Sequence, residues 1–296
     1  MVKDMNIYDI KNKANEVLRQ PNQLFKVILY IGIIQALFSA LSGIFNGILG
    51  TIISLMLSIL TMTLGHGVVV ASLKVVNNNG QSVDEKEDTL VGIKQFGNLF
   101  PTYFLYNVII AFAGIIIAVI GMVLMYTTMT DAQFKSLSQL ILMYVDKSTI
   151  AQGDLVNIVA SLSDMFSFGF ILVIVIAIVA VYLSLRFGLF NYVLQKYNYT
   201  GLKALKESSR LMNGNKWTLF KLEFSFFGWM ILAGLTSGVI AMFVETILPI
   251  DFLATFFTGV ISTFFSTYFY GVKLNTCLAV FYEELDYEDK NIVEQL

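Results

Sequence analysis

The chain has 296 residues, of which 56% are hydrophobic and only 14% are charged, whereas soluble domains carry about 25% charged residues. Its mean hydropathy is +0.73, so the composition excludes an ordinary soluble domain. The formal net charge of −2 is uninformative as a total, and we expect no nucleic-acid partner. We therefore expect an all-α, polytopic membrane protein built as a bundle of transmembrane helices.

Long runs without charged residues locate the membrane spans, because about 20 apolar residues cross the hydrocarbon core as a helix. Residues Val27–Leu73 form a run long enough for two helices, with the turn-forming pair Asn46-Gly47 between them. Four further spans are expected near residues 100–126, 166–194, 222–248 and 252–281. The sequence thus predicts six transmembrane helices.

The distribution of lysine and arginine predicts the orientation of these spans. If the N-terminus is cytoplasmic, 15 of the 19 basic residues fall in cytoplasmic segments, and only Lys135 and Lys147 lie outside. Cytoplasmic loops of membrane proteins carry such an excess of positive charge. We expect both termini to be cytoplasmic.

Three of the cytoplasmic segments resemble one another. Each has a Leu-Phe pair before an aromatic-rich span, in "NQLFKVILY", "GNLFPTYFLY" and "KWTLFKLEF", and each follows a stretch that suits a short interfacial helix. We interpret residues 1–296 as one membrane domain with three units at 1–76, 77–198 and 199–282 and an acidic cytoplasmic tail at 283–296. Phe25, Phe100 and Phe220 would then be equivalent. The alternative is chance recurrence in a chain rich in leucine and phenylalanine.

The second unit carries an external insertion, residues 127–164. Thr130 and Gln133 have the spacing of a capping box, and apolar residues then recur at helical spacing. A second stretch, from Leu155 to Leu162, repeats this pattern. Two short amphipathic helices on the outer surface of the membrane are expected here.

The segment "ALKESSRLMNGNKWTLFKLEFSFFGWMILAGLTSG", residues 204–238, resembles a known family. It is similar to the uncharacterised bacterial integral membrane proteins classed as domain of unknown function 975, as are "IKNKANEVL" near the N-terminus and "AVFYEEL" at residues 279–285. The resemblance implies a six-helix protein of the bacterial cell membrane. It implies no established activity.

Signatures of catalysis are absent from the sequence. There is one histidine, so neither an HExxH motif nor a multi-histidine metal site can form, and no GxSxG, Walker A or GxGxxG motif occurs. The acidic stretches Asp84–Asp88 and Glu283–Asp289 are expected to be solvated, the second as part of a partly disordered tail. We therefore expect no enzyme, no metal site and no cofactor.

Basic residues within the spans are the main functional candidates. Arg186 and Lys273 each follow 21 uncharged residues, and His66 lies at a similar depth in the other descending span. One interpretation is that the long side chains extend to the cytoplasmic headgroups at little cost. The other is a basic cavity, facing the inner leaflet, in which Glu223 pairs with Arg186 and an anionic ligand binds. A packed, hydrogen-bonded His66 is a more common arrangement than a proton relay.

Small residues at four-residue spacing form a second candidate feature. Ser39, Gly43 and Gly47 form one ladder, and Gly234 and Gly238 form another. Such ladders let helices approach closely. Packing within the chain is the first interpretation, and a homodimer is the second.

Two functions remain open on sequence alone. The first is a non-enzymatic accessory protein, acting in envelope stress or in tolerance to antimicrobial peptides, alone or with a membrane protein partner. The second is a permease or a lipid-handling protein whose basic cavity accepts an anionic substrate or lipid headgroup. A continuous polar cavity joining Arg186, Glu223 and Lys273 would favour transport, whereas a solid bundle would favour the accessory role.

Overall fold

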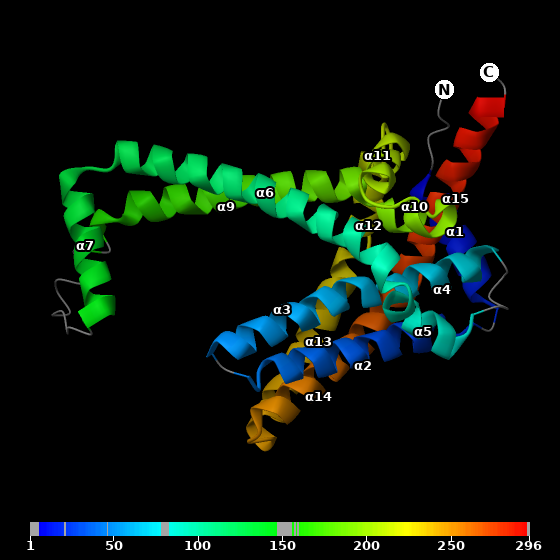
Figure 1. Cartoon of the computed structure of the whole chain (residues 1–296), viewed down its shortest axis with the longest axis horizontal. Helices are drawn as coiled ribbons and strands as arrows, with labels where there is room; N and C mark the ends of the chain where they lie inside the picture. The colour runs from blue at the N-terminus through cyan, green and yellow to red at the C-terminus, as the bar shows by residue number, and fades with distance from the viewer. Residues whose placement is uncertain are drawn as a thin grey trace. The chain divides into compact units, whose positions relative to one another are not determined.

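The structure is a computed structural model that describes residues 6–20, 22–45, 47–77, 83–146, 156, 158 and 160–294, and every regular element in these residues is helical. The elements are α1 (Ile7–Leu18), α2 (Leu24–Ser42), α3 (Gly47–Leu64), α4 (His66–Asn77), α5 (Glu85–Lys94), α6 (Phe96–Thr128), α7 (Asp131–Asp146), α9 (Ser163–Phe187), α10 (Phe190–Tyr197), α11 (Leu202–Leu211), α12 (Lys216–Phe224), α13 (Phe227–Ile247), α14 (Asp251–Ser266), the π-helix η1 (Thr267–Gly271) and α15 (Val272–Glu294) (Figure 1).

Six helical stretches in the described residues are long and apolar enough to cross a membrane. They are Leu24–Ser42, Gly47–Asn77, Phe96–Thr128, Met165–Tyr197, Phe227–Ile247 and Asp251–Tyr287. Large apolar side chains on them are exposed, such as Phe112 at 63% and Phe170 at 67%, as lipid-facing residues would be. The chain is an all-α, multi-pass membrane protein.

The chain divides into two compact units, one formed by residues 1–106 and 185–296 and the other by residues 107–184. The second unit contains α7 and most of α6 and α9. Within it, a Cβ added at Gly121 of α6 would overlap Leu172 of α9, so the two helices are closely packed there.

The predicted capping box at the start of α7 is confirmed. Gln133 Oε1 accepts a hydrogen bond from the Thr130 backbone N–H (3.0 Å), and Thr130 Oγ1 accepts one from the Gln133 N–H (3.3 Å). Of the second predicted amphipathic stretch, 155–162, the structure describes residues 156, 158 and 160–162, and among these Ile158 and Leu162 are buried.

The order of elements repeats three times along the chain. A short helix (α1, α5, α11) precedes the first membrane-crossing segment, which is α2, α6 or, in the third unit, α12 followed by α13. A second span then follows in two parts: α3 and α4, α9 and α10, or α14 and α15. The leucine of each Leu-Phe pair is fully buried, at Leu24, Leu99 and Leu219. The order of helices is similar in the three segments, and their equivalence as three units stays a prediction.

The units of the larger compact part are linked in a closed ring. The last helix of each unit packs against the short helix of the next: α4 against α5, α10 against α11, and α15 against α1. The residue eleven positions before each buried leucine makes a polar contact across this junction. Asp88 pairs with Lys74 (2.7 Å), Ser208 Oγ accepts the Leu189 N–H (3.1 Å), and Lys13 pairs with Glu284.

The last helices α4, α10 and α15 also contact one another through polar side chains. Lys196 of α10 pairs with Glu283 (2.5 Å) and Asp286 (2.9 Å) of α15, and Asn77 of α4 donates to Glu283 (3.3 Å). We call Asn77, Lys196, Glu283 and Asp286 the polar hub. The ring of Tyr192 stacks on Tyr282 beside it, with centroids 5.3 Å apart.

Both acidic stretches differ from the sequence expectation. The stretch Asp84–Asp88 leads into α5, and its last residue, Asp88, is 1% exposed in its pair with Lys74. The segment from Glu283 to Asp286 belongs to α15, and Asp286 is 3% exposed. The expectation of solvated runs was wrong for Asp88 and Asp286 because each meets a lysine from another helix.

The predicted packing glycines do not bring helices together in the described part of the chain. A Cβ added at Gly47, Gly234 or Gly238 would meet no atom within 4 Å, and at Gly43 it would meet only the carbonyl of Ala40 in the same helix. Gly47 begins α3 with a φ of +68°, so it does not share a helix with Gly43. The homodimer interpretation of these glycines stays a prediction.

Close approach occurs instead where α14 packs against α2 (Figure 1). A Cβ added at Gly32 would overlap the side chain of Thr263, and one added at Gly259 would lie 2.7 Å from the Ala36 Cβ. These two glycines set the distance between α2 and α14.

We expect Gly32→Ala to lower the free energy of unfolding by about 1–3 kcal/mol, because the added methyl group overpacks the contact with Thr263. Gly234→Ala is the matched control, since the position is open and alanine favours the helix by up to about 1 kcal/mol. Thermal melting in detergent measures both. Equal melting temperatures for the two variants would contradict the role of Gly32.

Candidate functional site

A cavity of about 530 Å³ lies between α1, the segment joining α12 to α13, and the junction of η1 with α15. Its polar wall comes from α1, Ser225 and the start of α15, and its apolar wall is largely aromatic. The lining residues are Lys11, Asn15, Ser225, Phe226, Trp229, Tyr268, Phe269, Tyr270, Val272, Lys273 and Cys277. We call this cavity the basic pocket.

Local structure fixes the α1 side of the basic pocket. Asn6 caps α1 by accepting a hydrogen bond from the Tyr8 N–H (3.0 Å). Ile10 and Ala14 are fully buried, which sets the rotation of the helix about its axis. Lys11 and Asn15, one residue further on, therefore line the pocket.

The π-helix η1 forms the opposite side. A π-turn holds an extra residue compared with an α-turn, so it changes the direction in which later side chains point, and such turns are frequent at functional sites. Lys273 is the second residue after η1. The aromatic wall is held by stacking of Trp229 on Phe269, with centroids 6.2 Å apart.

The basic pocket carries two ammonium groups and no carboxylate in its lining. Among the described residues, neither Lys11 nor Lys273 takes part in an ion pair. The Lys11 ammonium lies 4.8 Å from the ring centroid of Phe226, a cation–π distance. The two charges are therefore available to an anionic group that enters the cavity.

Arg186 lies elsewhere in the same compact unit. Its Nε donates a hydrogen bond to Ser209 Oγ (2.8 Å), its guanidinium lies 5.6 Å from the ring centroid of Phe187, and the residue is exposed. The structure thus places Lys273 and Lys11 in the lining of one cavity, and it places Arg186, near the end of α9, against Ser209 of α11.

Glu223 does not pair with Arg186 or Lys273 in the described part of the chain. It is half-buried in α12, and burial raises the pKa of its carboxyl above the ordinary value. A guanidinium or ammonium partner would have favoured the charged form instead. The ion pair that the sequence led us to expect is therefore not formed.

We expect Glu223→Gln to stabilise the protein at neutral pH. An acid whose folded pKa is raised binds more protons when folded, so stability falls as the pH rises from the ordinary glutamate pKa through the raised one. The melting temperature of the variant should be higher than that of the parent chain at pH 7.5 and equal to it at pH 4. Glu245→Gln, at an exposed position, is the control. Destabilisation at pH 7.5 would indicate a cationic partner.

His66 is fully buried and packed. Its Nε2 lies 3.0 Å from Gln195 Oε1, an acceptor, so Nε2 carries the proton and Nδ1 accepts the hydroxyl of Tyr103 at 3.0 Å. Both ring nitrogens are thus occupied. Across the described residues, no three His, Cys, Asp or Glu side chains are grouped as metal ligands would be.

Sequence reasoning finds Lys273 and misses Lys11, whose charge looks like one of many cytoplasmic ones. A signal for it exists in the repeat. Lys11, Lys86 and Lys206 each lie thirteen residues before the buried leucine of a Leu-Phe pair. A lysine at the same place in three units suggests a shared role at the same face of each short helix.

Comparison with known proteins identifies a family and gives no activity. No curated protein and no solved structure matches the chain. A family model matches residues 5–288, which include all six spans and both lysines of the basic pocket. The chain belongs to the family described as "Protein of unknown function (DUF975)".

Proposed function

We propose that this membrane protein is non-enzymatic and binds the phosphate headgroup of an anionic lipid in the basic pocket. The observation that carries the proposal is the pair Lys11 and Lys273, two lysines without ion pairs in the described residues that face one cavity with no carboxylate in its wall. Lysine is a common phosphate ligand that acts as a point charge. Two such charges favour a group with net negative charge over a zwitterionic one.

The aromatic wall supports a lipid as the source of the phosphate. Trp229, Tyr268 and Phe269 offer apolar faces, and aromatic residues of this kind concentrate at membrane interfaces. The orientation predicted from the basic residues would place α1 on the cytoplasmic side, so the lipid would come from the inner leaflet.

The accessory role remains our preferred cellular context. A permease needs a continuous polar path, and in the described residues Arg186, Glu223 and Lys273 share no hydrogen bond or ion pair. Lipid binding at one end of a packed bundle suits a protein that senses or organises the membrane during envelope stress. The cell membrane of a bacterium is the location that we propose.

Trp229 offers a direct test because it lines the basic pocket, and the chain has only two tryptophans. In a Trp217→Phe background, the fluorescence of Trp229 is followed in detergent while phosphatidylglycerol or phosphatidylcholine is added. We expect a saturable change in fluorescence that reaches its midpoint at a lower concentration of phosphatidylglycerol than of phosphatidylcholine. Lys11→Gln combined with Lys273→Gln should remove this preference.

Lys135→Gln, which removes one exposed charge in the other compact unit, is the control for each of the single variants Lys11→Gln and Lys273→Gln. Inorganic phosphate forms a separate arm, because a site for free phosphate would saturate with it as readily as with the lipid. Equal affinity for the two lipids, or an unchanged preference in the double lysine variant, would refute the proposed headgroup site.

A further inference from the structure

A second cavity, of about 330 Å³, lies between α2 and α5. Its wall is mainly apolar, with two charged residues at one edge. The lining residues are Tyr30, Ile33 and Ile34 of α2 and Glu85, Lys86, Thr89 and Leu90 of α5. We call it the α2–α5 groove.

The α2–α5 groove and the basic pocket occupy corresponding places in the repeat. The groove lies between α5, the short helix of the second unit, and α2 of the first unit. The basic pocket lies between α1, the short helix of the first unit, and the α12–α13 segment of the third unit, which precedes the first unit in the closed ring. On the short helices, Lys86 corresponds to Lys11, thirteen residues before the buried leucine of its own unit, and Leu90 corresponds to Asn15.

The span side of the two cavities corresponds as well. Tyr30 and Ser225 each lie six residues after the buried leucine of their span, and Ile34 and Trp229 each lie ten residues after it. All of these residues line their cavity. The two cavities therefore share lining positions on the short helix and on the span, and the basic pocket has a further wall from η1 and α15.

We propose that the α2–α5 groove is a second glycerophospholipid site, in which Lys86 holds the phosphate and the apolar wall holds an acyl chain. The proposal extends the proposed function to a second site, but it rests on different residues, so either site can fail alone.

The charges at the edge of the groove support a phospholipid and define its selectivity. Glu85 is paired with Lys26 at 2.6 Å, whereas Lys86 is exposed and has no ion pair among the described residues. The surface of the groove itself is apolar, so the Lys86 ammonium is available only at its edge, whereas two lysines line the more polar basic pocket. The groove should therefore bind phosphatidylcholine and phosphatidylglycerol with more similar affinity than the basic pocket does.

The apolar wall supports an acyl chain as the other half of the ligand. Ile33, Ile34 and Leu90 line it, and Leu90 is 37% exposed although it is apolar. Covering such surface with a hydrocarbon chain is favourable in proportion to the area removed from water. A free phosphate ion would gain nothing from this wall.

The experiment uses the correspondence between Ile34 and Trp229. Ile34→Trp in a Trp217→Phe, Trp229→Phe background puts the only tryptophan in the groove. In detergent, added phosphatidylcholine with brominated acyl chains should quench this tryptophan with a saturable curve. Lys86→Gln should weaken binding about tenfold, as expected for the loss of one charge-assisted hydrogen bond.

Two controls keep the result interpretable. Lys94→Gln removes a charge from the same helix without touching the groove, and it should leave the quenching curve unchanged. Leu90→Gln keeps Lys86 and makes the wall polar, so it should weaken quenching by the lipid; gel filtration checks that each variant is folded.

Quenching that rises linearly without saturation would overturn the proposal, as would equal curves for Lys86→Gln and the parent. Displacement of the lipid by inorganic phosphate at similar concentration would also overturn it, since the acyl chain would then contribute nothing. Lys11→Gln combined with Lys273→Gln should leave the quenching of the groove tryptophan unchanged, because the two sites use different residues. Loss of this quenching in the double lysine variant would also contradict an independent groove site.

Discussion

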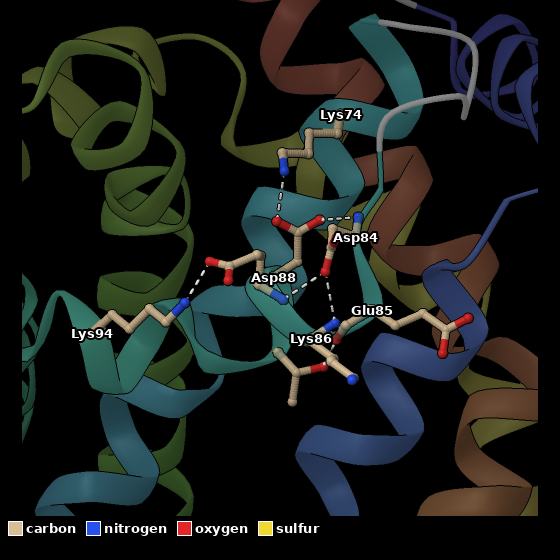
Figure 2. Close-up of polar contacts among 8 residues, drawn as sticks. Lys74, Asp84, Glu85, Lys86, Asp88 and Lys94 are labelled. Atoms are coloured by element: carbon tan, nitrogen blue, oxygen red, sulfur yellow. Dashed lines mark hydrogen bonds and ion pairs between the residues drawn. The ribbon is translucent and has the colours of Figure 1, made fainter.

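Replacing Lys74 by methionine should lower the free energy of unfolding by about 3–5 kcal/mol, because removing one partner of a buried ion pair leaves the other charge uncompensated. Asp88 is 1% exposed, and its Oδ1 lies 2.7 Å from the Lys74 Nζ. Its Oδ2 accepts the backbone N–H of Asp84 at 3.0 Å (Figure 2). Because the Lys74 side chain is 35% exposed, we expect the lower end of this range.

The cost should come from the stranded carboxylate, so neutralising it should restore stability. Asp88→Asn in the Lys74→Met background keeps an acceptor for the Asp84 N–H and removes the charge. Lys94→Met is the control, because Lys94 and Glu87 form an exposed pair (Figure 2) and such pairs contribute at most about 1 kcal/mol. The melting temperature in detergent is the measurement. Equal melting temperatures for Lys74→Met and the parent chain would show that the ion pair does not stabilise the protein.

The membrane fold could be predicted from the sequence because its signal is local. A span needs an uninterrupted apolar run, and each such run is visible without knowledge of its neighbours. The short helix α1 was likewise predicted, as one of the stretches that suit an interfacial helix, and its Ile10 and Ala14 are buried. The capping box of Thr130 and Gln133 has the same local character.

Burial of charge could not be predicted because it depends on partners far along the chain. Asp88 and Asp286 looked like members of solvated acidic stretches, and each is buried against a lysine of another helix. Lys74 is 14 residues from Asp88 in the sequence, and Lys196 is still further from Asp286. Only the packing of α4 on α5 and of α10 near α15 creates these sites.

The candidate site was predicted in part, for a related reason. The spacing of charges along a span gives depth in the membrane, and on that basis Arg186 and Lys273 were grouped together. Depth says nothing of the direction in which a side chain leaves the helix. The π-helix η1 precedes Lys273, which lines the basic pocket together with Lys11, whereas Arg186 donates a hydrogen bond to Ser209.

The polar hub should be the other strong determinant of stability. Lys196→Met would leave Glu283 and Asp286, whose side chains are 20% and 4% exposed, without their ammonium partner. We expect the free energy of unfolding to fall by about 3–5 kcal/mol, the cost of breaking a buried pair. Tyr197 still donates to Asp286 in the variant, but a neutral hydroxyl does not compensate a full charge.

The control and the rescue both use neighbouring residues of α15. Lys13→Met removes the partner of Glu284, one residue from Glu283, but the Lys13 side chain is 59% exposed, so we expect a loss of no more than about 1 kcal/mol. Glu283→Gln with Asp286→Asn should recover most of the stability lost in Lys196→Met. Because Asn77 also donates to Glu283, the hub joins the last helices of all three units. A loss in Lys196→Met no larger than that in Lys13→Met would show that apolar packing alone holds these helices together.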